Sequence, residues 1–377
     1  MADLKNIRRV LIANRGEIAV RIVRACRQLG VESVIVVSEA DRGALVTSLA
    51  DHVVEIGPAE AAASYLDIDR ILEAAKSTDS DAIHPGYGFL AENAEFARRV
   101  HEAGIIFIGP SADVIDAMGV KTTARERMET AGVPVVPGAR LPEGAEAAQL
   151  LEVAETVGYP LLAKAAAGGG GKGMRAVHAA EDLVASVKAA QREALTAFAD
   201  GTVYLERMLV EPRHVEVQIL ADAHGKVLHL GERDCSIQRR HQKVVEEAPA
   251  PGLDDDLRGR MHDAAVKAAE AVGYVGAGTV EMLLDRSGEF YFLEMNTRLQ
   301  VEHPVTELVW GLDLVQEQLR VADGQALPFR QDELEPRGHA MEVRLYAEDP
   351  DVGFLPQTGT VGVFDAASGA GVRMDSG

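Results

Sequence analysis

The chain has 377 residues, of which 47% are hydrophobic and 26% charged, and this length favours two or three domains because single cores rarely exceed about 250 to 300 residues. Its formal net charge of −21 argues against nucleic acid or an anionic membrane as the main partner, since both attract proteins rich in Lys and Arg. No apolar run approaches the roughly 20 residues of a membrane span, and no signal peptide is recognisable. Two cysteines are too few for a disulfide framework. We therefore expect a cytoplasmic globular protein.

The N-terminal part predicts a parallel α/β unit. Residues Val10–Ala13 form a short apolar strand, a helically spaced apolar pattern follows until Gly30, and Ser33–Val37 predicts a second strand. A further strand at residues 82–83 precedes a loop and a helix that begins near Glu92. No G-x-G-x-x-G follows the first strand, so dinucleotide binding has little support.

The middle of the chain changes from helices to strands. A helical stretch runs to about Ala131, and a linker rich in proline follows. Beyond it the pattern predicts a helix at about 145–157, strands at 160–164 and 174–177, mostly strands over 204–294, one helix at about 257–272, and a strand-like section from about Pro336.

Two strands around a tight turn carry the most informative pattern. If a four-residue loop follows Asp285, that residue pairs with Phe290, and the same register places Glu281 opposite Glu294. Two carboxylates about 4 Å apart repel each other by on the order of 4 kcal/mol at an effective dielectric of about 20, so we expect a cation nearby. Asn296 lies on the same face, and this set of oxygens suits Mg²⁺ with bound phosphates. The alternative is a solvated polar face, which the apolar flanking residues disfavour.

The segment after this hairpin extends the polar face. If it stays extended, Arg298, Gln300 and Glu302 lie on one side, which aims an arginine and a carboxylate at the phosphates bound to the metal. Such an arginine can bind a small anion with two hydrogen bonds, and the glutamate can act as a general base. The alternative is a surface ion pair.

Three further segments bear on phosphate binding. Residues 164–173 join two strands through four consecutive glycines and do not form a P-loop. Their backbone amides can cover phosphates as a mobile lid, with Lys164 at the strand end. The alternative is a plain linker. In strand 213–221, His214, Glu216 and Gln218 share a side that faces a cleft or water. The basic run 238–243 is either a solvated face or the positive field that a triphosphate needs.

The combined pattern resembles a known superfamily. Lys164 with its glycine run, residues 206–209, and the Glu281, Glu294 and Asn296 set resemble ATP-grasp enzymes. Four longer strings are similar to the biotin carboxylase family: LIANRGEIA at 11–19, HPGYGFLAEN at 84–93, RDCSIQRRHQK at 233–243 and EMNTRLQVEHP at 294–304. The resemblance runs from residue 4 to the end and implies an α/β ATP-grasp fold with an N-terminal Rossmann-like domain and a strand-rich C-terminal domain.

The resemblance also implies the nucleotide and metal ligands. ATP would be held by Lys121, Lys164, Gly170, Gly171, Glu206, Arg207, Met208, Leu209, His214, Gln238, His241, Glu281, Leu283 and Glu294. The oxygens of Glu281, Glu294 and Asn296 would hold one or two Mg²⁺ ions, for which Mn²⁺ can substitute. Arg207 stands where the family often has lysine, which matters little because residues 206–209 contact adenine mainly through the backbone.

The chemistry follows from the same resemblance. Lys243, Arg298 and the backbone of Val301 would bind bicarbonate, Glu302 would deprotonate it, and Arg344 would contact the ureido group of biotin. Bicarbonate would attack the γ-phosphate of ATP to give carboxyphosphate, which breaks down near the biotin N1′. Lys243, Arg298, Glu302 and Arg344 are therefore the predicted catalytic residues. Without the resemblance, Arg344 would pass for a surface residue on a strand.

Domain boundaries and partners complete the prediction. We expect an N-terminal domain at 1–113, an ATP-grasp domain at 114–335 with a mobile lid at about 136–205, and an incomplete C-terminal domain at 336–377. The chain has no Met-Lys-Met attachment motif, so biotin would arrive on a carrier domain or protein. A carboxyltransferase subunit and a homodimer or larger complex are expected, most similar to the alpha subunit of an acyl-CoA carboxylase.

Two alternatives stay open at this point. One is another ATP-grasp ligase, such as half of a carbamoyl-phosphate synthetase, which lacks stimulation by free biotin. The other is a nucleotide-binding module without catalysis, which would bind Mg·ATP but release no ADP in response to bicarbonate.

Overall fold

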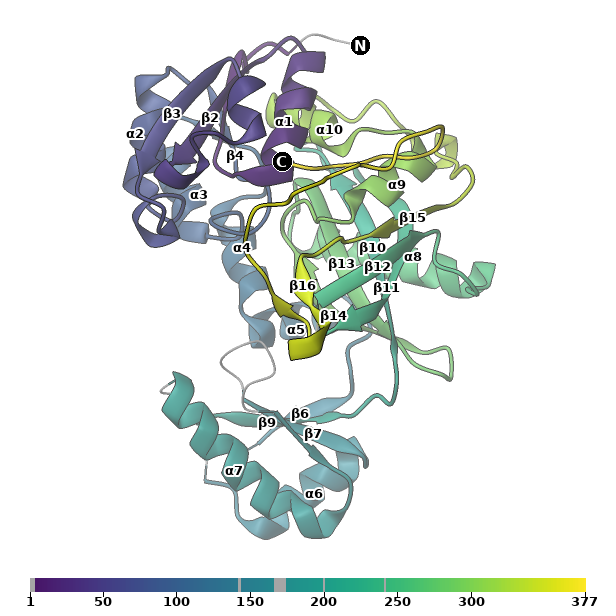
Figure 1. Cartoon of the computed structure of the whole chain (residues 1–377). Coiled ribbons are helices and arrows are strands. Elements are labelled where there is room, and N and C mark those ends of the chain that lie inside the picture. Colours follow the sequence, from purple (N-terminus) through teal and green to yellow (C-terminus); the bar gives the residue numbers. More distant parts are fainter. Residues whose placement is uncertain (1–3, 142–143, 166–173, 199–200, 241) are drawn as a thin grey trace.

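A computed structural model describes residues 4–141, 144–165, 174–198, 201–240 and 242–377 of the chain. Figure 1 shows an N-terminal α/β domain packed on a central domain with a large antiparallel sheet, and a smaller lobe that carries α6 and α7. The predicted mixed α/β architecture, with a parallel N-terminal sheet and antiparallel sheets after it, is confirmed. Across the described ranges, no helix combines the length and apolar character that a bilayer span requires.

The N-terminal domain is a parallel sheet with the strand order β3-β2-β1-β4-β5. Apolar side chains of α1, among them Ile18 and Ile22, pack on one face, and those of α2 and α3, such as Ile71 and Phe96, pack on the other. Its strands are apolar throughout because both faces are buried. The elements are β1 (Arg9–Ile12), α1 (Gly16–Gln28), β2 (Glu32–Ser38), β3 (His52–Gly57), α2 (Ile68–Ser77), β4 (Ala82–His84), α3 (Ala94–Glu102), β5 (Ile106–Phe107) and α4 (Ala112–Gly119).

The central domain has a six-stranded sheet in the order β14-β13-β10-β11-β12-β15. Val215, Val217 and Ile219 alternate along β10 and face α8, whose alanine-rich side completes an apolar core. The intervening residues of β10 point to the opposite face, toward α9. The elements are α5 (Lys121–Thr130), β10 (Arg213–Ala221), β11 (Val227–Arg239), β12 (Gln242–Ala248), α8 (Asp255–Ala271), β13 (Gly276–Leu284), β14 (Phe290–Asn296), α9 (His303–Trp310), α10 (Leu314–Ala322) and β15 (Ala340–Val343).

The smaller lobe has a core of its own. Its sheet has the order β6-β9-β7-β8, and α6 and α7 pack on it through residues such as Leu150, Leu183 and Val187. The lobe meets the central domain where Phe292 N donates to Pro134 O at 2.7 Å. The elements are β6 (Gly138–Arg140), α6 (Ala147–Val157), β7 (Leu161–Ala165), β8 (Met174–Val177), α7 (Ala180–Phe198) and β9 (Val203–Arg207).

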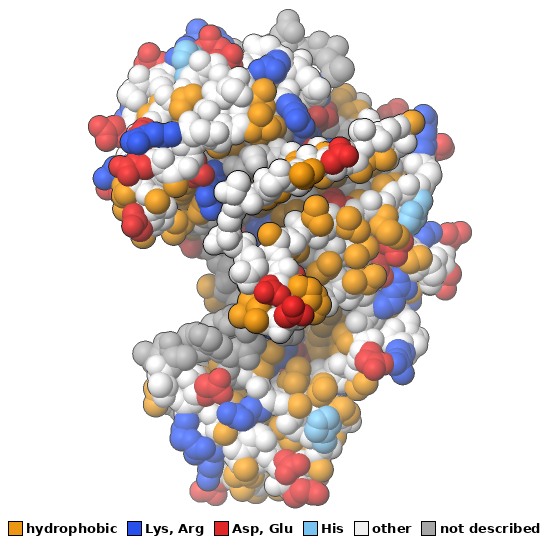
Figure 2. All heavy atoms as spheres, viewed as in Figure 1, with side chains coloured by type: hydrophobic (Ala, Val, Ile, Leu, Met, Phe, Trp, Pro, Cys, Tyr) orange, Lys and Arg blue, Asp and Glu red, His pale blue; other side chains and the backbone are white. Residues whose placement is uncertain are grey.

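The C-terminal segment crosses the central domain and ends beside α1 (Figure 1). It forms a small sheet from β16 (Glu348–Asp349) and β17 (Leu355–Pro356), and Arg373 Nη1 then donates to Glu307 Oε2 at 2.6 Å. Figure 2 shows apolar side chains gathered on this face of the molecule. Within the C-terminal segment, Leu345 is 79% exposed and Val363 is 86% exposed.

Candidate active site

The β13–β14 hairpin places Glu281 opposite Glu294, as predicted, but by a different register at the turn. Leu284, rather than Asp285, pairs with Phe290, so the predicted pairing of Asp285 is wrong. Asp285 N instead donates to Glu289 O at 2.8 Å and closes the turn. A bulge then inserts one extra residue, Leu293, into β14 and shifts the register back. The two offsets cancel, which is why simple counting reached the correct pair.

Glu281 is surrounded by donors. His214 Nε2 lies 2.9 Å from its Oε2, and Lys243 Nζ donates to its Oε1 at 2.7 Å. The amides of Asn296 and Gln300 donate to the same Oε1 at 2.9 and 2.8 Å. Burial alone would raise the pKa of Glu281, but His214 and Lys243 hold the pKa well below its usual range. Lys243 supplies the positive charge that the facing carboxylates were expected to need, and His214 adds a contact to Glu281.

Glu294 has a different environment from its partner. Burial and the charge of Glu281 raise the pKa of Glu294, while Lys121 acts in the opposite direction. Lys121, Glu294 and Asn296 line a pocket of about 210 Å³ together with Glu92 and residues of α4. The pocket therefore places an ammonium group beside two of the three predicted metal ligands.

Lys243 joins three carboxylates. Its Nζ donates to Glu216, to Glu281 and to Glu302, the last at 2.7 Å. Burial would lower the pKa of Lys243, but the three carboxylates raise it well above its usual range, so the ammonium stays charged. One ammonium thus connects a predicted metal ligand with the predicted general base.

The segment after β14 departs from the predicted extended course. The strand ends at Asn296, and the chain turns at Val301 and Glu302 into α9. Leu299 is nevertheless buried in the core, while Gln300 and Glu302 point into the polar cluster. The predicted distribution of side chains holds although the backbone is a loop.

Arg298 and Arg344 complete the cluster from two sides. Arg298 Nε donates to Glu92 Oε2 at 2.8 Å, and its Nη2 donates to Asn296 Oδ1 at 2.9 Å. Arg344 follows β15, and its Nη2 donates to Glu302 Oε2 at 2.9 Å. The residue that the local pattern alone would place on the surface therefore lies against the predicted base.

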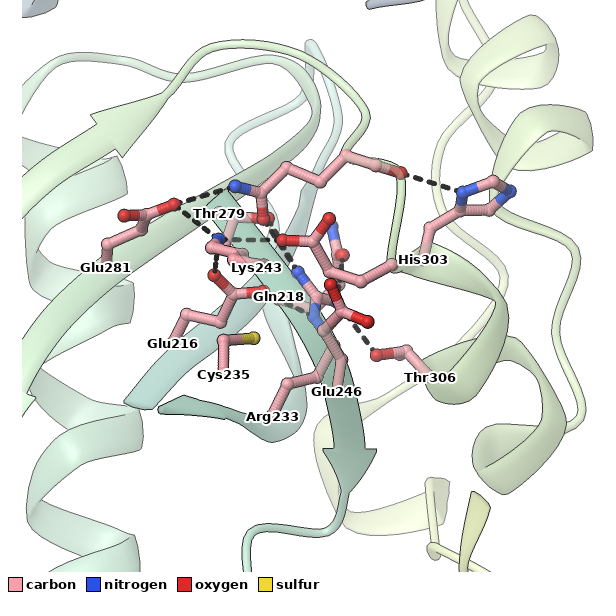
Figure 3. Close-up of polar contacts among 12 residues, drawn as sticks. Glu216, Gln218, Arg233, Cys235, Lys243, Glu246, Thr279, Glu281, His303 and Thr306 are labelled. Atoms are coloured by element: carbon pink, nitrogen blue, oxygen red, sulfur yellow. Dashed lines mark hydrogen bonds and ion pairs between the residues drawn. The ribbon is translucent and has the colours of Figure 1, made fainter. Parts of the chain in front are cut away.

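Arg233 organises the layer beneath these residues, and the sequence pattern did not identify it. Its side chain is fully buried, and Figure 3 shows it at the centre of the contacts. The guanidinium donates to Glu216 Oε1 at 2.6 Å, Gln218 Oε1 at 2.7 Å, Thr306 Oγ1 at 2.9 Å, Gln300 Oε1 at 2.9 Å and Thr279 Oγ1 at 3.1 Å. Counting residues back from the β10–β11 turn would have placed Glu232 across from Glu216; an irregularity between Val217 and Ile219 shifts the register by one residue and brings Arg233 there instead.

The polar face of β10 is enclosed, which corrects the expectation that it faces a cleft or water. Glu216 and Gln218 have no exposed surface, and His214 is half-buried. Gln238 Nε2 lies 3.1 Å from His214 Nδ1, so these two predicted ATP ligands touch. Leu283 is the β13 residue paired with His214.

The basic run contributes less to the site than predicted. Lys243 enters the carboxylate cluster, but Arg239 pairs with Glu348 and Arg240 Nη2 donates to Gly353 O at 2.9 Å. These two arginines hold the C-terminal segment against the sheet. The predicted ATP ligand His241 lies outside the described residues, as do Gly170 and Gly171.

The predicted adenine segment lies on β9 and just after it. Lys164 and Glu206 form an ion pair across β7 and β9, and Arg125 approaches Glu206 at 3.5 Å. The amides of Arg207 and Met208 donate to Pro137 O and Pro160 O at 2.8 and 2.9 Å, while Leu209 follows them in the chain. Lys164 therefore belongs to the smaller lobe, apart from the cluster around Lys243.

The oxygen donors fit a hard divalent cation. Glu281 and Glu294 offer carboxylate oxygens and Asn296 offers an amide oxygen, which is the donor chemistry that Mg²⁺ and Mn²⁺ accept. In the structure His214 and Lys243 contact Glu281, and Arg298 donates to the amide oxygen of Asn296. Metal binding would therefore displace His214 and Lys243 from Glu281 and Arg298 from Asn296.

Comparisons with known proteins agree with this geometry. A family model described as "Biotin carboxylase, N-terminal domain" matches residues 6–115, and one described as "Carbamoyl-phosphate synthase L chain, ATP binding domain" matches residues 120–330. Biotin carboxylase 1 of Bacillus subtilis (strain 168) is 54% identical over 372 residues, which cover 98% of this chain and 82% of that protein.

Solved structures of biotin carboxylases are similar to the chain as well. The biotin carboxylase complex with β-γ-ATP from Campylobacter jejuni has 48% sequence identity and a TM-score of 0.90, over 98% of this chain and 82% of that one. The biotin carboxylase domain dimer of Hydrogenobacter thermophilus 2-oxoglutarate carboxylase, solved with MgADP, ADP and bicarbonate, has 45% identity and a TM-score of 0.87, over 97% and 80%. The chain belongs to the biotin carboxylase family.

Proposed function

We propose that the cluster around Lys243 is where this biotin carboxylase activates bicarbonate with Mg·ATP and transfers the carboxyl group to biotin. The observation that carries the proposal is the position of Glu302 between Lys243 and Arg344, at 2.7 and 2.9 Å. Lys243 also contacts Glu281, so the proposed base and the proposed metal site share one cation.

The nucleotide half of the reaction would use residues of both the central domain and the smaller lobe. Glu281, Glu294 and Asn296 would hold Mg²⁺, which neutralises charge on the phosphates and orients them for in-line attack. Lys121 lies beside Glu294, where it can meet the nucleotide. Lys164 and residues 206–209 would bring the smaller lobe onto the nucleotide, since they lie on β7 and at the end of β9.

In the bicarbonate half of the reaction, Lys243, Arg298 and Arg344 would exchange their present hydrogen-bond acceptors for the substrates. Glu302 accepts hydrogen bonds from two cations, so it can take a proton from bicarbonate once the substrate draws Lys243 toward itself. Arg298 would turn from Glu92 and Asn296 to the anion, next to the backbone of Val301. Arg344 would then leave Glu302 to stabilise the ureido oxygen of biotin as negative charge develops on it.

Partners follow from the chemistry and the relatives. The 2-oxoglutarate carboxylase domain is described as a dimer, which supports a dimer here. Biotin carried by a separate carrier domain and a carboxyltransferase that uses the product are proposed as well. Acceptor choice belongs to that carboxyltransferase, so the acyl-CoA preference stays a prediction, as do the cytoplasmic location and the domain limits at 113 and 335.

The test is ADP release that depends on bicarbonate and free biotin. Arg298→Ala or Glu302→Gln should lower this turnover at least about 100-fold, because general base catalysis and anion positioning each contribute that much, while Mg·ATP binding measured by calorimetry is retained. Arg286→Ala, which removes an exposed ion pair with Glu211, is the matched control. Near-normal turnover in either site variant would refute the proposed roles. Turnover in the unaltered protein without any response to biotin would favour a different ATP-grasp ligase.

A further inference from the structure

Two glutamates face each other behind Arg344, outside the site described above. Glu246 on β12 and Glu342 on β15 are direct cross-strand partners in the antiparallel register. Glu246 has no exposed surface. Facing like charges destabilise a strand pair, and a buried carboxylate pair cannot ionise fully without a compensating group. The arrangement therefore requires either two cations or a proton.

Arg344 compensates only part of the negative charge that Glu246 and Glu342 would carry. Arg344 Nε donates to Glu246 Oε1 at 2.8 Å. Oε2 of Glu246 and Oε2 of Glu342 are both buried and accept no hydrogen bond from any residue that the structure describes. A proton between the two carboxyl groups would satisfy one oxygen of each at once, since a protonated carboxyl is a donor and its neighbour an acceptor.

The surrounding charges favour retention of that proton. Burial raises the pKa of Glu246 to about 7, with Glu302 acting in the same direction and Arg344 against it. Burial raises the pKa of Glu342 to about 8, with Glu246 and Glu302 adding to the effect. α9 packs on both strands through the apolar Val305 and Val309. The charged or titratable groups near the pair are Glu216, Arg233, Glu302, Arg344 and, beside Arg344, Tyr346.

We propose that Glu246 and Glu342 share one proton and act as positioning residues for Arg344. With one proton, the pair carries a single negative charge and holds the Nε edge of the guanidinium, which leaves the Nη2 edge for Glu302 or for the ureido oxygen of biotin. When the proton is lost, a second negative charge draws Arg344 back from the substrate. The proposal rests on the proposed contact between Arg344 and biotin.

The consequence for catalysis is a biotin-specific pH dependence. Glu246→Gln removes the anion from Nε of Arg344 and should lower kcat/KM for free biotin about tenfold or more, while KM for ATP and for bicarbonate stays within about twofold. Glu246→Asp should recover part of the loss. Glu342→Gln keeps the charge on Glu246 but removes the second ionisation. The unaltered enzyme should show a fall in kcat/KM for biotin above about pH 8, and Glu342→Gln should retain activity at pH 7 and lack this fall.

The matched control is Glu247→Gln. Glu247 is the next residue of β12, lies on the opposite face and contacts His339 at 3.1 Å. Its substitution should leave the biotin kinetics and their pH profile unchanged. Equal kinetics and equal pH profiles for the Glu246, Glu342 and Glu247 variants would overturn the proposal. No biotin-dependent turnover in the unaltered enzyme would instead refute the proposed function itself.

A second measurement needs no turnover. Infrared difference spectra of the unaltered protein between pH 6 and pH 9 should contain the carbonyl band of a protonated carboxylic acid. This band should be absent from the spectra of Glu342→Gln. Glu17, whose pKa is raised to about 7 by burial and by Asp375, titrates in the same range, so the comparison with the variant is essential. An unchanged band in both Glu246→Gln and Glu342→Gln would show that no proton is shared.

Discussion

The two faces of β11 hold buried charge in different ways. Arg233 points inward and donates to five side chains from four segments of the chain. Its neighbour Glu232 points outward to α8, where it accepts from Arg258 Nε at 2.8 Å and from His262 Nε2 at 2.6 Å. Adjacent residues of one strand thus anchor two separate networks. One supports the proposed catalytic cluster, and the other attaches α8.

The difference indicates where rigidity serves chemistry. Through Gln300 and Glu216, Arg233 fixes groups that contact Glu281 and Lys243. The described partners of Glu232, Arg258 and His262, belong to α8 and contact neither Glu281 nor Lys243. We therefore expect changes on the inner face to affect stability and turnover together, and changes on the outer face to affect stability alone.

The largest effect is expected from Arg233→Met. The variant leaves Glu216 without one of its two cations in a fully buried position, and removing one partner of a buried ion pair typically costs about 3–5 kcal/mol. Urea denaturation should show this loss. Gln300 would also lose the bond that orients its amide toward Glu281, so turnover of the remaining folded enzyme should fall at least about tenfold. Full turnover per folded molecule would contradict the link between the inner face and catalysis.

A smaller effect is expected from Glu232→Gln. The amide retains one acceptor for Arg258 or His262, so the cost should be about 1–2 kcal/mol, as for the loss of a hydrogen bond to a charged group. The denaturation midpoint should shift, while turnover and KM at 25 °C stay within about twofold. A loss of turnover as large as that of Arg233→Met would show that the two faces are coupled.

The same comparison explains what the sequence could and could not predict. The strand periodicity of β10 and the spacing of Glu281, Glu294 and Asn296 are local, so the hairpin and its facing carboxylates could be predicted. Arg233 acquires its role from contacts with residues up to 73 positions away, and its own neighbours in the sequence do not indicate them. Arg344 is similar, because its partner Glu302 lies 42 positions away on another element.

Some errors in the predictions from the sequence also have a physical origin. The bulge at Leu293 lies beside the linker, where Phe292 N donates to Pro134 O. The turn after Asn296 leads into α9, which begins directly after Glu302. α7 was not predicted, although it is the longest helix that the structure describes. Its polar, exposed side and the neighbouring glycine run obscured the helical period. The run 238–243 was interpreted as a solvated face or as a positive field for a triphosphate, because nothing nearby in the sequence reveals Glu348 or Gly353 as the partners of Arg239 and Arg240.

The smallest effect concerns acid stability of the outer face. His229 stacks on His262 with ring centroids 4.0 Å apart, and burial together with His262 lowers the pKa of His229 to about 4, while Glu232 acts in the opposite direction. Because the folded-state pKa of His229 lies below the unfolded value of about 6.5, the folded protein binds fewer protons than the unfolded chain. The contribution of His229 to stability should therefore be complete above pH 6.5 and decline as the pH falls toward 4.

His229→Phe keeps the ring contact but cannot be protonated. Its melting temperature should therefore fall by a few degrees less than that of the unaltered protein between pH 7 and pH 4.5. His178→Gln, at an exposed histidine, is the control that should follow the unaltered curve. Identical curves for all three proteins would exclude His229 as a source of acid sensitivity and leave the inner carboxylates as its cause.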